Sequence, residues 1–216
     1  MGGTTGLAPE QLAALGRIAV LPQAAELHLA GGSAVAFHFA HRRSEDVDLF
    51  STTPELDLRA LQRAMIAHFP GVSVRGATDV TLKVIADGAT IDFVRYPYPP
   101  MEPPTPGPAG FPVAGVRDLA AMKLAAISDR GIRRDFWDLY VMARSGRSLV
   151  DMASDYQRKF GRQESDLYHV FRSLTYFADA ESDPIYPAGL TPSAWDGIKA
   201  YFEAEAASLL RASPGT

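Results

Sequence analysis

The chain has 216 residues, of which 47% are hydrophobic and 21% are charged, so it can bury a sizeable core as one domain or two small ones. It contains no cysteine, which excludes disulfides, thiolate zinc sites and a cysteine nucleophile. The net charge of −4 argues against a protein that coats nucleic acid non-specifically. The sequence has no signal-peptide pattern and no stretch typical of a membrane span, so we expect a soluble cytoplasmic protein.

The first part of the chain mixes helical and strand patterns. A helical pattern covers residues 7–19, and a short buried strand at 27–30 leads into Gly31-Gly32 and a compact apolar helix at 33–40. The patterns that follow predict a strand at 46–50, an amphipathic helix at 58–69, and strands at 72–75, 80–86 and 90–96, the last two joined by a hairpin turn at Asp87-Gly88.

A segment dense in proline, residues 98–113, comes next. Proline fixes φ and lacks a backbone donor, so this segment disfavours helices and sheet interiors and favours an extended linker. Beyond it the spacing of apolar residues predicts a helical bundle. We therefore expect an α/β (α+β) chain: a small mixed-sheet domain at residues 1–97, a linker at 98–113, and a helical domain at 114–216 with helices at 116–128, 132–143, 149–160, 165–177 and 194–211.

Asp46 and Asp48 alternate with Val47 and Leu49 in the second predicted strand. Alternate side chains of a strand share a face, so both carboxylates project to one side while the apolar residues face the core. Carboxylates so close repel each other, and magnesium prefers oxygen ligands, so a divalent cation is their natural partner. An isolated Asp-x-Asp pattern is also common at solvated strand ends, so its interpretation depends on the other motifs.

The glycine pair and a third aspartate favour a phosphate-handling site. Gly31-Gly32-Ser33 opens a helix, where free amides and the helix dipole suit phosphate, although on its own a tight turn is the simpler explanation. Asp92 stands between Ile91 and Phe93, a setting too apolar for an incidental solvent-facing charge. Together the three aspartates predict two magnesium ions, one to orient a triphosphate and one to activate an attacking hydroxyl.

Two segments resemble a known family. GGSAVAFHFAHRRSEDVDLF, which begins at Gly31, resembles the active-site segment of the nucleotidyltransferase-like AbiEii/AbiGii toxin family, a branch of the DNA polymerase beta-type nucleotidyltransferases. DLAAMKLAAISDRGIRRDFWDLYVM, which begins at Asp118, resembles that family's second conserved block, where a helix supplies a lysine and the next helix begins with an Asp-x-x-Asp pattern. The resemblance covers about residues 25–145.

The resemblance implies roles for single residues. Gly32 and Ser33 would cradle the nucleotide phosphates, Asp46 and Asp48 would bind metal, and Asp92 would be the third carboxylate. Lys123 would contact the triphosphate. This fits a lone ammonium on an otherwise apolar helix, although a lysine that reaches the surface is the alternative explanation.

Four further residues are candidates for supporting roles. Arg43 and Ser44 precede the strand of the two aspartates and either touch phosphate or fix the loop through hydrogen bonds to a carboxylate. Asp135 and Asp138 share one helix face and either hold Lys123 or Arg134 in place, or form a helix N-terminal charge and an ion pair at the rim of the core.

These patterns predict a magnesium-dependent nucleotidyltransferase that moves a nucleoside monophosphate from a nucleoside triphosphate to a hydroxyl. The resemblance implies a toxin of a toxin–antitoxin or phage-defence system that acts on RNA, with tRNA ends as one acceptor and a cognate antitoxin as a partner. Residues 117–162 contain ten Lys or Arg and six Asp or Glu, and this +4 balance suits RNA. Two alternatives stay open: nucleotidylation of a small molecule or a protein, and a catalytically silent binding partner with the same fold.

Overall fold

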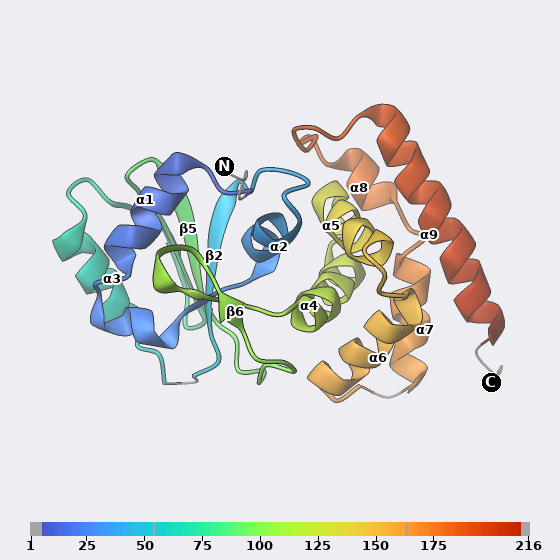
Figure 1. Cartoon of the computed structure of the whole chain (residues 1–216), viewed down its shortest axis with the longest axis horizontal. Helices are drawn as coiled ribbons and strands as arrows, with labels where there is room; N and C mark the ends of the chain where they lie inside the picture. The colour runs from blue at the N-terminus through green and yellow to red at the C-terminus, as the bar shows by residue number, and fades with distance from the viewer. Residues whose placement is uncertain (1–5, 54, 163, 213–216) are drawn as a thin grey trace. The chain divides into compact units, whose positions relative to one another are not determined.

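A computed structural model describes residues 6–53, 55–162 and 164–212 of the chain (Figure 1). The chain divides into two compact units, one ending at Gly115 and the other beginning at Val116. The first unit contains a seven-stranded mixed sheet with helices and the second is helical, which confirms the predicted α/β class. Over the described ranges, no helix is long and apolar enough to cross a membrane.

The sheet of the first unit is built around a parallel pair of long strands. Their parallel register and the antiparallel pairing of the neighbouring strands make the sheet mixed. The strands are β1 (His28–Leu29), β2 (Asp46–Ser51), β3 (Ser73–Ala77), β4 (Thr81–Ala86), β5 (Ala89–Arg95), β6 (Thr105–Pro106) and β7 (Pro112–Val113), in the order β3-β4-β5-β2-β1-β7-β6.

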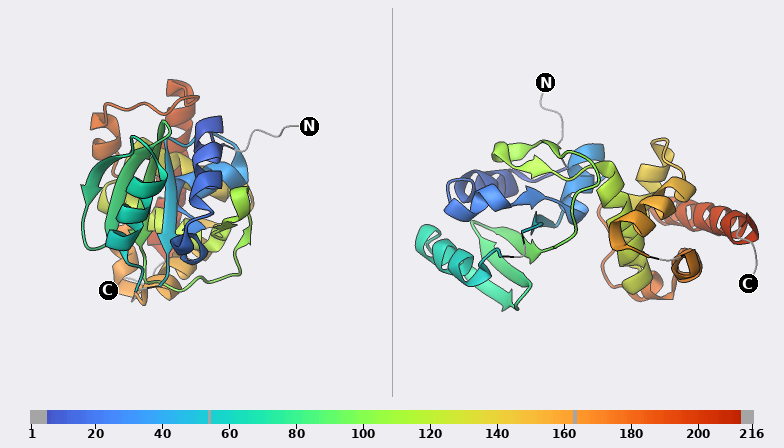
Figure 2. Two further views of the ribbon diagram at one scale, coloured as in Figure 1. Left: turned by 90° about the vertical axis from the view of Figure 1, so that its left-hand side faces the viewer. Right: turned by 90° about the horizontal axis from the view of Figure 1, so that it is seen from below.

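Helices lie on both sides of this sheet. The α-helices are α1 (Pro9–Ile18), α2 (Gly31–Phe39) and α3 (Leu58–His68), and the 3-10 helices are η1 (Pro22–Glu26) and η2 (Pro108–Gly110). Figures 1 and 2 show α1 and α3 on one side of β5 and β2, with α2 on the other. Burial alternates along β2, β4 and β5, so every second residue faces the core and the residues between them line the opposite face.

The proline-rich segment differs from the expected linker. Part of it forms β6 and β7, and β7 pairs in parallel with β1 through Leu29 and Val113. The amide of Ala114 donates to the carbonyl of Leu29, and its own carbonyl lies 2.9 Å from Nε2 of His38. The segment therefore completes the sheet as far as Gly115. β6 is the edge strand, a position that tolerates proline, and Pro112 is the first residue of β7. Two-residue strands leave no periodic pattern in the sequence.

The second unit contains helices α4 (Val116–Asp129), α5 (Arg133–Arg144), α6 (Leu149–Phe160), α7 (Glu164–Ser173), α8 (Ala178–Ser182) and α9 (Pro192–Ala212). Its core gathers aromatic rings around Phe136, whose centroid lies 5.2, 5.8 and 5.5 Å from those of Phe177, Trp195 and Phe202. Phe136 is fully buried, so these rings join α5 to α9 and to the segment before α8.

Phe136→Ala should lower the free energy of unfolding of the helical unit by about 3–5 kcal/mol, because it removes a buried ring and leaves a cavity. Both tryptophans, Trp137 and Trp195, lie in this unit, so urea unfolding followed by tryptophan fluorescence reports on it. Tyr176→Ala truncates an exposed ring and should cost less than about 0.5 kcal/mol. Equal losses for the two variants would show that Phe136 does not organise this core.

Candidate active site

The three predicted aspartates lie on one face of two adjacent strands. β2 and β5 run parallel, with Asp48 opposite Asp92 and Asp46 opposite Thr90. All four residues are partly exposed, and they alternate with buried apolar residues on both strands. The pairing of β2 with β5 therefore brings Asp92 beside Asp48 despite their separation in sequence.

A lysine that the sequence analysis missed lies among these carboxylates. Lys83 on β4 is opposite Asp92 in the antiparallel register. Its Nζ lies 3.1 Å from Oδ2 of Asp92 and 4.0 Å from Oδ2 of Asp46. The signal was present in the sequence, because Lys83 stands between Leu82 and Val84 on a strand with alternating burial. The predicted hairpin turn at Asp87-Gly88 also places Lys83 opposite Asp92, but the sequence analysis did not use this register.

The electrostatics of Asp92 follow from this arrangement. Burial raises the pKa of Asp92 and the charge of Asp46 adds to the rise, while the hydrogen bond and charge of Lys83 oppose it without cancelling it. Burial disfavours the charged form of Lys83, yet Asp92, Asp46 and Asp48 together outweigh it and raise the lysine pKa. Lys83 therefore compensates the negative charge of this face as a bound cation would.

One oxygen of Asp92 fits a cation ligand. Oδ1 of Asp92 is buried and has no hydrogen-bond partner among the described residues, an arrangement that costs free energy unless a cation or donor reaches it. Asp46 and Asp48 present further carboxylate oxygens on the same face, the ligand type that Mg²⁺ prefers. As placed, no three Asp, Glu, His or Cys side chains of the described part of the chain form a group that could hold a metal ion.

The glycine turn is bound to the aspartate strand. Gly31 has φ of +53°, and a Cβ there would come within 2.7 Å of the Asp48 carboxylate, so only glycine fits. The Ser33 amide donates to Oδ2 of Asp48 at 3.0 Å, and the Asp48 amide donates to Oγ of Ser33 at 2.9 Å. The negative carboxylate thus lies at the positive N-terminus of α2.

The contact between Ser33 and Asp48 involves the residue that was expected to bind phosphate. Ser33 is fully buried, and its hydroxyl donates to the carbonyl of Ala30. In the structure its amide and hydroxyl are both engaged within the protein, and they fix the position of Asp48. Phosphate binding by Gly31, Gly32 and Ser33 stays a prediction.

Ser44 and Arg43, the candidate residues just before β2, differ in burial. Ser44 is buried, and its hydroxyl donates to the carbonyl of Asp46 at 2.8 Å, which fixes the entry into the strand. Arg43 is exposed. Its neighbour Arg42, which the sequence analysis did not select, is buried and donates to the carbonyl of Arg43 at 3.1 Å. Loop fixation thus describes Ser44, and Arg43 keeps its charge at the surface.

The second unit brings Lys123 together with Asp135 and Asp138. Nζ of Lys123 lies 2.8 Å from Oδ1 of Asp135 and 2.7 Å from Oδ2 of Asp138, and the three side chains are almost completely buried. Nε of Arg130 also donates to Asp135 at 3.1 Å. Burial alone would raise the pKa of Asp135, but Lys123 and Arg130 outweigh it and lower the pKa. The aspartates therefore hold Lys123, and its contact with triphosphate stays a prediction.

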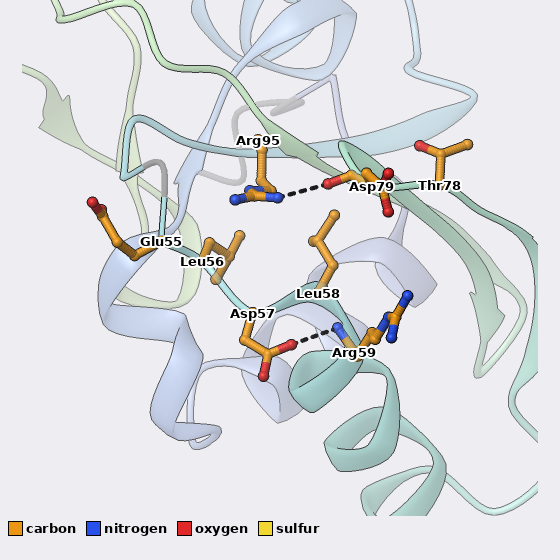
Figure 3. Close-up of a pocket in the computed structure, with 8 residues that line it drawn as sticks. All are labelled: Glu55, Leu56, Asp57, Leu58, Arg59, Thr78, Asp79 and Arg95. Carbon is orange, nitrogen blue, oxygen red and sulfur yellow. Dashed lines mark hydrogen bonds between the residues drawn. The ribbon is translucent and has the colours of Figure 1, made fainter.

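A cavity of about 300 Å³ opens elsewhere in the first unit (Figure 3). Arg95 lies three residues after Asp92 on β5, and alternation directs the two side chains to opposite faces of the sheet. Nη1 of Arg95 donates to the carbonyl of Asp79 across this cavity. The cavity is therefore separate from the carboxylates of Asp46, Asp48 and Asp92. Its lining is Glu55, Leu56, Asp57, Leu58, Arg59, Thr78, Asp79 and Arg95.

Comparisons with known proteins identify a family and a similar fold. Residues 13–208 match the family described as "Nucleotidyl transferase AbiEii toxin, Type IV TA system". An uncharacterized protein of Aquifex aeolicus, aq_aa25, is 32% identical over 201 residues, which are 91% of this chain and 94% of that protein. The crystal structure of JHP933 from Helicobacter pylori has a similar fold, with a TM-score of 0.51 at 17% identity over 95% of this chain and 96% of that one.

Lys83→Met should raise the pKa of Asp92 further, because it removes the cation that opposes the effect of burial. Carboxyl-carbon NMR titration measures this directly. The pKa of Asp92 is higher in the folded protein than its usual value of 3.8, so protonation of Asp92 favours the folded state. The contribution of Asp92 to stability therefore falls as the pH rises from 3.8 to its pKa in the folded protein. The fall should be larger in Lys83→Met than in the wild type.

Lys199→Met is the matched control, since Lys199 pairs with the exposed Glu181 in the other unit. It should leave the titration of Asp92 unchanged. An Asp92 titration that is also unchanged in Lys83→Met would contradict the charge compensation described for this face.

Proposed function

Because the chain belongs to the AbiEii nucleotidyl transferase toxin family of type IV toxin–antitoxin systems and is a nucleotidyltransferase, we propose that it moves a nucleoside monophosphate from a nucleoside triphosphate to an RNA hydroxyl. One observation carries this proposal: the parallel register of β2 and β5 gathers Asp46, Asp48 and Asp92 on one face, beside the N-terminus of α2.

Asp46, Asp48 and Asp92 would hold two Mg²⁺ ions through their carboxylate oxygens, including the buried Oδ1 of Asp92. When bound, Mg²⁺ supplies positive charge against the triphosphate and makes the attacking hydroxyl easier to deprotonate. The carboxylates fix the relative positions of nucleotide and acceptor, and Ser33 orients Asp48 through its amide and hydroxyl.

Several positive groups would bind the phosphates. The N-terminus of α2 at Gly31, Gly32 and Ser33 offers the positive end of a helix dipole, and Arg43 offers an exposed guanidinium. Lys123 would neutralise charge that develops on the triphosphate, as the family resemblance implies. Its two aspartate partners would limit the rotation of the ammonium.

The family supports an antitoxin partner, and the charge of the chain supports an RNA acceptor. A toxin of a type IV system acts in a cell that also makes an antitoxin, so an antitoxin is the expected cognate partner. The +4 balance of residues 117–162 supports an RNA acceptor, with tRNA ends as one candidate. Nucleotidylation of a small molecule or a protein would need no such excess of positive charge, and comparing acceptors in one transfer assay separates these cases.

Asp48→Asn should abolish transfer of labelled nucleotide to RNA in the presence of Mg²⁺. The substitution keeps an oxygen that can accept from the Ser33 amide but removes the charge that metal binding requires. It should also relieve any growth arrest caused by expression of the wild type. Neutralising one of several clustered carboxylates should leave the melting temperature of the metal-free protein equal or higher.

Asp57→Asn is the matched control, because Asp57 also caps a helix, accepting from the amides of Arg59 and Ala60 at the start of α3. It should retain full transfer. Equal labelling by Asp48→Asn and the wild type would refute the metal mechanism. No labelling of RNA by the wild type, with labelling of a protein or small molecule instead, would refute the RNA acceptor.

Lys123→Met should reduce kcat for nucleotide transfer at least ten-fold, because it removes a positive charge proposed to act on the triphosphate. Lys159→Met is the control, since Lys159 is equally buried and its Nζ donates to Asp118 at 2.6 Å. Either change removes the ammonium that faces a buried carboxylate and should cost about 3–5 kcal/mol of stability. Activity is therefore compared per folded molecule, and equal activity of the two variants would remove Lys123 from the mechanism.

A further inference from the structure

Three aromatic side chains continue the carboxylate face of the first unit. Phe50 lies two residues after Asp48 on β2, so it projects to the same face, and its register partner Val94 lies two residues after Asp92. Beyond them, Tyr96 and Tyr98 follow the end of β5, and the amide of Tyr96 donates to the carbonyl of Ser51 at 2.7 Å. Phe50, Tyr96 and Tyr98 are called the aromatic shelf below.

The rings of the aromatic shelf contact one another in sequence. The centroids of Phe50 and Tyr96 lie 5.2 Å apart, and those of Tyr96 and Tyr98 lie 4.9 Å apart, with tilted planes in both pairs. Such distances are typical of attractive aromatic pairs. The shelf is therefore one continuous apolar surface whose rings support each other's positions.

Exposure distinguishes this group from the core of the protein. The rings packed around Phe136 in the second unit are buried, whereas Phe50 and Tyr96 are half-buried and Tyr98 is 37% exposed. A cluster that served only folding would gain more free energy from complete burial. The shelf thus keeps ring surface accessible beside a group of charged side chains.

The position of the shelf matches the shape of a nucleotide. Strand residues rise by about 3.3 Å each, so the Cα of Phe50 lies roughly 6.6 Å from that of Asp48 along the same face. On the other side of the carboxylates the chain is polar, with Ser44 and Glu45 preceding Asp46. A triphosphate held at the aspartates carries its nucleoside with it, and the apolar end of the face is where a flat apolar base gains most from contact.

We propose that the aromatic shelf stacks against the base of the bound nucleoside triphosphate. The inference rests on the proposed function, since it places the nucleoside beside the carboxylates that would hold its phosphates. Stacking on an aromatic ring depends little on which base is bound, because every base has a π face. The shelf therefore supplies affinity for nucleosides as a class.

The test compares two ligands that differ in the base. Calorimetry with Mg²⁺ measures the Kd of a non-hydrolysable ATP analogue and that of inorganic tripolyphosphate, which has no nucleoside. Phe50→Leu and Tyr98→Leu should weaken binding of the analogue about ten-fold or more, the effect of removing a base–aromatic stack. Neither variant should change the Kd of tripolyphosphate more than two-fold. Tyr98→Phe keeps the ring and should bind the analogue as the wild type does.

Tyr176→Leu removes an exposed ring from the other unit and serves as the control, with both Kd values unchanged. A parallel loss of both ligands would overturn the inference, because the rings would then support only the phosphate site. Unchanged binding of the analogue by Phe50→Leu and Tyr98→Leu would also overturn it. If these variants lost only RNA binding, the shelf would belong to the acceptor site instead. A wild type that binds neither ligand would instead reject the proposed triphosphate site itself, together with this inference.

Discussion

Positive groups that compensate partly or fully buried carboxylates hold neighbouring elements of this protein together. Five aspartates of the candidate active site and of the Lys123 cluster lie against positive groups, because an uncompensated buried charge is far more costly than the same charge in water. Asp48 lies at the N-terminus of α2, Asp92 and Asp46 share Lys83, and Asp135 and Asp138 share Lys123. These contacts fix the glycine turn against β2, β4 against β5, and α4 against α5.

The ion pairs of the helical unit join its helices, whereas the carboxylates on β2 and β5 form a partly exposed group. Lys159 with Asp118, and Arg117 and Arg147 with Asp155, join α4 to α6 and to the segment before α6, and the two aspartates in these contacts are buried. The carboxylates on β2 and β5 are partly exposed, repel one another and leave Oδ1 of Asp92 without a hydrogen bond among the described residues. Clustered carboxylates of this kind are typical of functional sites, and this arrangement supports the proposed metal site.

Much of the fold could be predicted from the sequence because its elements are strongly periodic. The helix at α6 and the strands at β2 and β5 follow directly from apolar spacing, and Asp46 and Asp48 could be placed on one face from alternation alone. The pairing of β4 with β5 follows from the predicted hairpin turn at Asp87-Gly88, but its register was not used to place Lys83 opposite Asp92. The pairing of β2 with β5 could not be predicted, since it depends on contacts between distant segments, and β6 and β7, two-residue strands rich in proline, were expected to be linker.

The central claim is that Asp48 and Asp92 jointly hold a metal-bound triphosphate on the face that they share. A crystal structure of the protein with Mg²⁺ and a non-hydrolysable nucleoside triphosphate tests it most directly. The account predicts metal density in contact with both carboxylates, with Oδ1 of Asp92 as a ligand and Nζ of Lys83 moved away from Oδ2. A triphosphate bound instead in the cavity between Arg59 and Arg95, with Lys83 still paired to Asp92, would contradict it.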